Sequence, residues 1–210
     1  MIKGLEASGE QLRKWGDSVT EAVVHYLEAL SEGKVAAPDL DVRTVKEAVE
    51  EPLPRTSQGW DKAWQDTLSR VVPHSVRVGH PHFLAWIRTS PLAAAVFAES
   101  LAAALNQSVA VWDGAPAAAE VEKLVIRWLV EMSGFHPDGS GLLTSGGSMA
   151  NFSGLAAARS AAFPGVREQG VRSGPQLTVY TTSQAHYSVI KAVEMLGLGR
   201  RCIREVPVDQ

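Results

Sequence analysis

Apolar side chains recur every three or four residues over long stretches of the chain, which is the spacing of one face of an α-helix. The clearest stretches predict helices over residues 5–31, 60–72 and 117–132. Gly33, Pro73 and Gly134 follow them and are residues that end helices. A single apolar stripe needs a covering surface, so we expect the first helix to pack either on its own domain or on a second subunit.

The pattern changes in the second half, where short β-rich runs alternate with helical ones. Strands are expected at 142–143, 177–181 and 202–208, with helices over 150–159 and 187–196 between them and a polar loop over 165–175. This alternation predicts a parallel α/β sheet. Ligands of such sheets bind outside the carboxyl ends of the strands.

The middle of the chain is apolar but less regular. Residues 91–105 predict a long buried helix, and the segment before Pro91 is expected to be extended. His80 and His82 alternate by two, so a strand would place both on one face. A metal site is a poor explanation, because no Cys, Asp or Glu cluster accompanies the two histidines. A lining segment is the simpler interpretation.

Composition narrows the class of protein. The chain has 210 residues, a hydrophobic content of 45% and a net charge of -3, so no basic field favours nucleic acid. Cys202 is the only cysteine, which excludes an intrachain disulfide and favours a reducing compartment. Neither a signal peptide nor a membrane-spanning run is apparent. We therefore expect a cytoplasmic protein with no membrane or nucleic-acid partner.

A glycine turn enters one of the predicted helices. The run Ser145-Gly146-Gly147-Ser148 separates an apolar strand end from strong helix formers. Free N–H groups at the start of a helix, together with the helix dipole, attract an anion such as phosphate. The alternative is an ordinary helix start with Ser148 as its N-cap. His186 follows the next predicted strand, so both features fall at carboxyl ends of strands.

Four blocks then carry a family resemblance: HPHFLAWIRTSP from His80, WDGAPAAAEVEKLVIRWL from Trp112, GLLTSGGSMANFSGLAAAR from Gly141 and SQAHYSVIKAVEMLGLG from Ser183. In this order and spacing the chain resembles the pyridoxal 5′-phosphate (PLP)-dependent group II amino acid decarboxylases, the relatives of aromatic-L-amino-acid decarboxylase. The resemblance implies an α/β fold of PLP fold type I, the aspartate-aminotransferase-like large domain. Residues 1–75 would form an N-terminal helical arm, and 76–210 the first part of that domain.

The resemblance also assigns roles to single residues. Gly147 and Ser148 match the turn that binds the cofactor's phosphate, with Gly146 and Asn151 as further cofactor-binding candidates. His186 matches the catalytic histidine that stacks on the pyridine ring.

A second set matches the substrate pocket of the family: Trp86, Thr89, His82 and Trp112. Beside Trp112 the chain reads Gly114-Ala115-Pro116-Ala117, where alanine replaces the serine usual in the family. Trp86 hints at an apolar or aromatic substrate side chain.

Two groups that PLP chemistry requires are missing from the matched positions. The family's Schiff-base lysine directly follows a histidine, and this chain has no His-Lys pair. Lys191, five residues after His186, is expected to be a solvated helix residue. Nor does Asp209 match the aspartate that pairs with the pyridine nitrogen.

We therefore expect one part of a PLP-dependent, carboxy-lyase-like enzyme that acts on an amino acid. A complementary chain would carry the C-terminal half with the lysine and the aspartate, in a dimer or heterotetramer. By itself the chain would be inactive. The alternative is a non-catalytic, partner-binding or regulatory subunit derived from the same fold.

Overall fold

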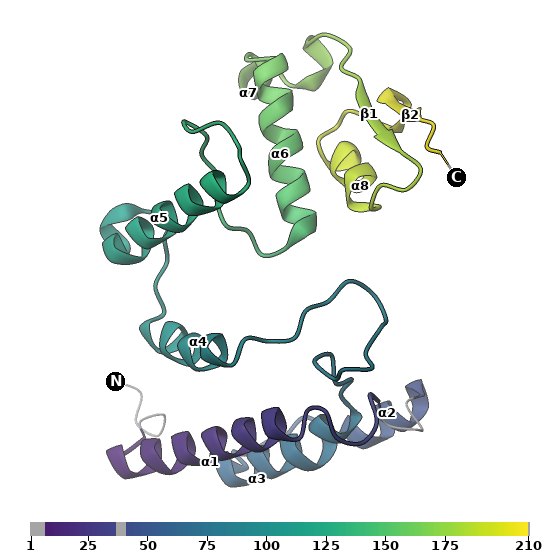
Figure 1. Cartoon of the computed structure of the whole chain (residues 1–210). Helices are drawn as coiled ribbons and strands as arrows, with labels where there is room; N and C mark the ends of the chain where they lie inside the picture. Colours follow the sequence, from purple (N-terminus) through teal and green to yellow (C-terminus); the bar gives the residue numbers. More distant parts are fainter. Residues whose placement is uncertain (1–6, 37–40, 210) are drawn as a thin grey trace. The chain divides into compact units, whose positions relative to one another are not determined.

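The structure is a computed structural model that describes residues 7–36 and 41–209. The chain divides into two compact units, Met1–Asn106 and Gln107–Gln210, drawn from purple to teal and from teal to yellow in Figure 1. Residues 5 and 6 of the first predicted helix lie outside the described residues. The predicted boundary between a helical arm (1–75) and an α/β domain (76–210) stays a prediction.

The first helix, α1 (Gly9–Glu28), begins at a capping box. The Ser8 Oγ accepts a hydrogen bond from the Gln11 N–H at 3.2 Å, and the Gln11 Oε1 accepts one from the Ser8 N–H at 2.8 Å. This exchange satisfies N–H groups that a helix start otherwise leaves free. The helix ends before Ala29, so the predicted element is confirmed but stops short of Gly33.

Three further helical segments complete the N-terminal part of this unit: α2 (Val42–Val49), α3 (Gly59–Asp66) and the continuation of α3 through a π-turn, η1 (Thr67–Val71), and a 3-10 turn, η2 (Val72–His74). The indole rings of Trp15, Trp60 and Trp64 stack in series, with centroids 5.0 and 5.6 Å apart. Lys14 pairs with Asp61 at 3.1 Å. Part of the apolar stripe of α1 is thus covered within its own unit.

The segment after η2 departs from the extended chain predicted before Pro91. Residues 78–82 form turns, and residues 85–87 form a bend. The His82 N–H donates to the His80 Nδ1 at 3.0 Å, and their rings meet edge to face at 5.3 Å. A bond between residues two apart requires a turn, so the prediction of an extended chain was wrong for these residues, and the two histidines do not lie on one face of a strand.

Helix α4 (Ala93–Leu105) confirms the predicted helix but not its burial. None of its thirteen residues is buried, and Leu101 is 63% exposed. Apart from Glu99 and Ser100 the helix is apolar all round, so several elements would have to surround it to cover it.

The second unit opens with a 3-10 turn, η3 (Trp112–Gly114), and the long helix α5 (Pro116–Met132). Pro116 is the first helical residue, where a missing N–H is tolerated. Leu142 and Leu143 are not a strand, contrary to prediction, and both are exposed. The Leu143 N–H instead donates to the Glu122 carboxylate of α5 at 2.9 Å.

A small α/β arrangement follows. Its elements are α6 (Gly147–Ala162), α7 (Val166–Gln169), the 3-10 turn η4 (Val171–Ser173), β1 (Val179–Thr182), α8 (Ser188–Met195), the 3-10 turn η5 (Arg200–Cys202) and β2 (Ile203–Val206). The predicted polar loop over 165–175 thus contains two short helical turns. Strands β1 and β2 pair in parallel, with Val179 opposite Ile203 and Thr182 opposite Val206. The predicted strand–helix–strand order is confirmed for β1, α8 and β2.

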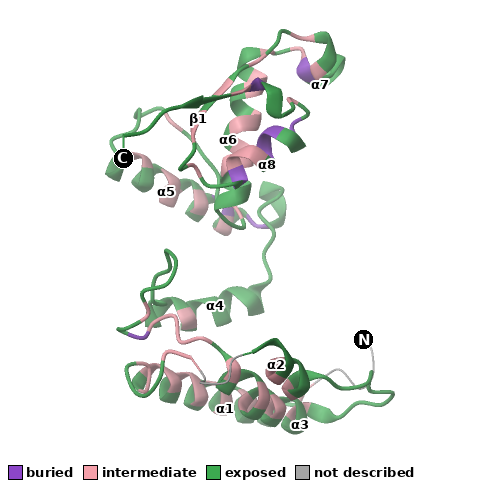
Figure 2. Ribbon diagram, turned by 90° about the vertical axis from the view of Figure 1, so that its right-hand side faces the viewer, coloured by how far each residue is buried: buried purple, intermediate pink, exposed green. Residues whose placement is uncertain are grey.

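Buried residues of the second unit gather around α8, as Figure 2 shows. Val193 is fully buried, and Ala192, Leu196 and Cys202 are at most 5% exposed. Helix α6 packs beside α8, where the Arg159 guanidinium donates to the Leu196 carbonyl at 3.0 Å. This core supports the two elements that carry the candidate site.

No helix in the described part of the chain is both long enough and apolar enough to cross a membrane.

Candidate functional site

The glycine turn forms the N-terminus of α6. Gly146 is the N-cap, and Gly147 and Ser148 are the first two helical residues. The helix therefore begins three residues before the predicted Ala150, and Ser148 is not the N-cap. The Gly146 carbonyl accepts the N–H groups of Met149 and Ala150, both at 3.0 Å.

Two backbone donors at this N-terminus stay free. Among the described residues, no acceptor lies within hydrogen-bond reach of the Gly147 or Ser148 N–H. Both residues are exposed, and a methyl group placed on Gly147 would have open space around it. Free N–H groups at the positive end of a helix dipole are suited to a phosphate.

His186 lies in the turn that joins the carboxyl end of β1 to α8. The Ala185 N–H closes the turn on the Thr182 carbonyl at 3.1 Å, and the Val189 N–H donates to the His186 carbonyl at 3.0 Å as α8 begins. His186 is exposed, and its ring lies 4.2 Å from that of Tyr187. The sequence prediction of a histidine at the end of a strand is confirmed.

Side-chain hydrogen bonds join the two features. The Asn151 amide Nδ2 donates to the Ser188 Oγ at 2.8 Å, and this oxygen lies 2.8 Å from the His186 Nδ1. Asn151 is four residues, about one helical turn, after Gly147 in α6. The glycine turn and His186 therefore lie at one edge of the second unit, although only His186 follows a strand.

Ser188 is the member of this group that the sequence did not single out. It is 2% exposed, and it is the first residue of α8. The one signal available in the sequence is its position two residues after His186. Lys191, one turn after Tyr187, is exposed, and its ammonium lies 4.6 Å from the centre of the Tyr187 ring.

A hydrogen bond to helix α5 fixes the side chain of Trp112. Its indole Nε1 donates to the Glu120 carboxylate at 2.9 Å, and Lys123 also donates to that carboxylate at 2.7 Å. The hydrogen bond from Lys123 and then that from Trp112 lower the pKa of Glu120 below its ordinary value of 4.5. Trp112 is 54% exposed.

The other predicted substrate-binding residues, His82, Trp86 and Thr89, belong to the first unit. Trp86 has a positive φ of 56°, which is rare for a bulky residue, and it is 77% exposed. The Arg88 guanidinium lies 5.7 Å from the Trp86 ring centre. Because the two units are described separately, membership of these residues in a pocket with His186 stays a prediction.

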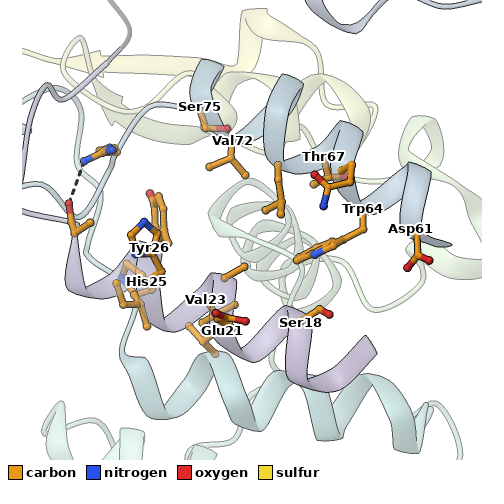
Figure 3. Close-up of a pocket in the computed structure, with 18 of the residues that line it drawn as sticks. Ser18, Glu21, Val23, His25, Tyr26, Asp61, Trp64, Thr67, Val72 and Ser75 are labelled. Carbon is orange, nitrogen blue, oxygen red and sulfur yellow. Dashed lines mark hydrogen bonds between the residues drawn. The ribbon is translucent and has the colours of Figure 1, made fainter. Parts of the chain in front are cut away.

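The first unit also contains a groove that the sequence did not predict. It lies between α1 and the α3–η1–η2 segment, and Figure 3 shows Tyr26, Trp64, Thr67 and Val72 among its lining residues. The lining is mainly apolar, and it also includes the charged side chains of Lys14, Glu21, Asp61 and Arg77. Within the described ranges, no group of three or more His, Cys, Asp or Glu side chains could hold a metal ion.

An α/β unit with a free helix N-terminus and a histidine at the neighbouring strand end has the features of a site for a flat, phosphate-bearing cofactor. Residues 43–210 match the family model described as the pyridoxal-dependent decarboxylase conserved domain. The chain belongs to this family, and PLP is the family's cofactor. The resemblance inferred from the four sequence blocks is thus confirmed.

Individual relatives agree with the family match. The chain is 28% identical over 210 residues to the aromatic-L-amino-acid decarboxylase of Bacillus atrophaeus, covering 100% of this chain and 42% of that protein. It is 30% identical over 139 residues to the human acidic amino acid decarboxylase GADL1, covering 66% and 26%. These relatives are decarboxylases, hence lyases, and the chain spans less than half of their length.

Solved structures confirm the fold class. The Oryza sativa TDC structure with PLP and tryptamine matches with a TM-score of 0.83 at 25% identity, over 99% of this chain and 45% of that one. Catharanthus roseus tryptophan decarboxylase in complex with L-tryptophan matches with a TM-score of 0.83 at 23% identity, over 99% and 44%. These are PLP-dependent decarboxylases of fold type I.

The residues present fit the phosphate and the ring of PLP. The Gly147 and Ser148 N–H groups are donors without an acceptor, and glycine at 147 leaves room for a ligand to approach the backbone. The exposed imidazole of His186, linked to α6 through Ser188 and Asn151, offers a flat face at the same edge of the unit.

Proposed function

We propose that this chain supplies the phosphate-binding turn, the ring-stacking histidine and part of the substrate pocket of a PLP-dependent amino acid decarboxylase. The Gly147 and Ser148 N–H groups and the Ser148 hydroxyl would bind the phosphate. His186 would stack on the pyridine ring, with Gly146 and Asn151 shaping the surroundings. The observation that carries the proposal is the Asn151–Ser188–His186 hydrogen-bond series, which ties both elements to one edge.

Bound PLP supplies an electron-withdrawing ring that lets the carboxylate of an attached amino acid leave as carbon dioxide. This chain's part would be binding and orientation. Trp112, fixed by Glu120, and the Trp86–Thr89 segment would line the space for the substrate side chain. They would exclude water from the reacting group.

The lysine that holds the cofactor and the carboxylate that faces the pyridine nitrogen would come from a complementary part. This is supported by the absence of a His-Lys pair from the sequence and by the 42% share of the Bacillus relative that the chain covers. Exposed apolar residues on α4 and α5, such as Leu101 and Leu129, would be covered by that part or by a second copy. The assembly would be a dimer or heterotetramer in the cytoplasm.

The test is PLP binding and fixation by the natively purified chain, with and without any protein that co-purifies. We expect a visible absorption band in the complex and, after borohydride treatment, PLP attached to a lysine of the second chain. Ser148→Ala and His186→Ala should weaken the band, whereas Ser183→Ala should not, because the exposed Ser183 makes no hydrogen bond among the described residues.

Three other outcomes are informative. Fixation of PLP at Lys191 would show that this chain carries the lysine itself and would contradict the need for a complement. A stable complex that never binds PLP would favour the non-catalytic, partner-binding subunit. Equal loss of the band in Ser183→Ala and Ser148→Ala would contradict the role of the glycine turn.

A further inference from the structure

The buried hydroxyl of Ser188 lies between the amide of Asn151 and the ring of His186. Asn151 belongs to α6 and Ser188 to α8, so the contact joins two helices and the β1–α8 turn. Ser188 is 2% exposed, and its backbone N–H also reaches the His186 Nδ1, at 3.3 Å. Two groups of one serine thus meet the same ring nitrogen.

These contacts decide where the neutral imidazole carries its proton. A backbone N–H is always a donor, so the Nδ1 that faces it acts as an acceptor and has no hydrogen. The Ser188 hydroxyl then donates its single proton to the same Nδ1 and accepts the Asn151 amide proton on its oxygen. The remaining proton of the neutral ring lies on Nε2.

The opposite arrangement would lose hydrogen bonds. With a proton on Nδ1, the ring would donate to the Ser188 Oγ, which already accepts from Asn151. The Ser188 N–H would then face another N–H at 3.3 Å, and the serine hydroxyl proton would need a different acceptor. A buried polar group without a partner is unfavourable, so the first arrangement is preferred.

We propose that Ser188 is a positioning residue that holds His186 in the tautomer with the proton on Nε2. The Nε2–H is thereby available to donate a hydrogen bond to an acceptor atom of a ligand bound at the glycine turn. In the proposed function, on which this inference rests, that acceptor belongs to the bound cofactor or to the carboxylate of the substrate. Asn151 sets the direction of the serine proton and is the second positioning residue.

The test measures the tautomer directly in the chain without ligand. Long-range ¹H–¹⁵N spectra of histidine-labelled chain distinguish the two tautomers, and His186→Gln identifies the His186 signals among the six histidines. The spectra are recorded at about pH 8.5, roughly two units above the ordinary imidazole pKa of about 6.5. We expect the Nε2–H form to dominate in the unsubstituted chain.

Two substitutions perturb the Asn151–Ser188–His186 hydrogen-bond series in different ways. Ser188→Ala removes one neutral hydrogen bond and should raise the share of the Nδ1–H form about fivefold. Asn151→Asp places an acceptor where the donor was, so the serine proton should turn toward residue 151. The Ser188 N–H still faces Nδ1 in this variant, so the share of the Nδ1–H form should rise, and the form need not become the major one. The nearby Ser183→Ala is the matched control and should leave the tautomer ratio unchanged.

A mainly structural role for Ser188 would not shift the tautomer ratio in Asn151→Asp. An Nδ1–H form dominant in the unsubstituted chain would overturn the proposal. So would a ratio in Ser188→Ala and Asn151→Asp equal to that of Ser183→Ala. Since Asn151 is only half-buried, its variant remains informative if Ser188→Ala does not fold.

Titrations with PLP and with inorganic phosphate separate this inference from the proposed function. Ser188→Ala should weaken PLP about fivefold and leave phosphate binding unchanged, because phosphate alone does not need His186. Equal weakening of both ligands would mean that the glycine turn itself had been disturbed, which would contradict a positioning role. Binding of neither ligand by the unsubstituted chain would refute the proposed function while leaving the tautomer measurement valid.

Discussion

Gly147→Pro tests the phosphate site because it removes one candidate donor, the N–H of residue 147. Gly147 is the first residue of α6, the position at which proline best fits a helix. Its N–H bonds to no acceptor in the described structure, so the substitution removes no internal hydrogen bond. Gly146 before it has a φ of 159° and a ψ of 171°, so its ψ is close to the extended values found before proline, and its φ is one that glycine adopts readily. The fold should therefore be kept while one candidate phosphate donor disappears.

The expected loss follows from the strength of that donor. A hydrogen bond to a charged group contributes about 1.5–3 kcal/mol, so the affinity for PLP and for inorganic phosphate should fall roughly 10- to 150-fold. The free energy of unfolding should stay equal or rise by about 0.4–1 kcal/mol, because proline restricts the unfolded chain. Fluorescence titration measures the affinities, and urea denaturation measures the stability.

Gly147→Ala is the matched control, because it keeps the N–H and adds a methyl group to open space. It separates the loss of a donor from crowding at the turn. If the proline variant binds both ligands as tightly as the alanine variant, the Gly147 N–H is not a phosphate donor. If both variants lose affinity equally, the side-chain volume matters and the donor does not.

Two further changes test the packing and the electrostatics. Gly79→Ala should lower the free energy of unfolding by about 1 kcal/mol, because its methyl group would lie 2.5 Å from a terminal carbon of Leu30 and 2.7 Å from the Ser90 hydroxyl, and both side chains would have to move. Gly16→Ala, in the open interior of α1, should instead raise the free energy of unfolding by about 0.5–1 kcal/mol. Equal effects of the two substitutions in urea denaturation would contradict this. Hydrogen bonds from Lys123 and Trp112 lower the pKa of Glu120, so the stabilisation they provide is complete above the unfolded value of 4.5 and is lost as pH falls through the lower folded value. The fluorescence assigned to Trp112 should therefore change only below pH 4.5, and a change at neutral pH would oppose this assignment, as would an identical acid response in Glu120→Gln.

Most helices could be predicted from the sequence because the spacing of apolar residues that indicates a helix lies within the helix itself. The spacing of apolar residues placed α1, α5 and α8, and the alternation of elements predicted the parallel pairing of β1 with β2. The start of α6 was missed by three residues because glycine and serine have low helix propensity, yet Gly147 and Ser148 occupy its first turn. Boundaries depend on caps, and a glycine N-cap leaves little trace in sequence.

Burial and long-range contacts were harder to predict from the sequence than the helices were. Leu142 and Leu143 have the composition of a strand end, but a strand needs a neighbour, and the Leu143 N–H bonds to Glu122 instead. Residues 91–105 have the composition of a core helix, but burial depends on what surrounds it. Ser188 shows the same limit at the site, because its role follows from Asn151, 37 residues earlier, and no local pattern reports such a contact.

The candidate site residues therefore differ in the packing that fixes their positions. The glycine turn and His186 rest on helices α6 and α8, which share a core containing the fully buried Val193. Trp86 and Thr89 lie in an exposed segment of turns and bends with little packing of its own. A preorganised site binds more tightly because less ordering is needed on association. Phosphate binding should accordingly need only the α6–α8 core. Selection of the substrate side chain should also need the complementary part or second copy that covers the segment containing Trp86 and Thr89.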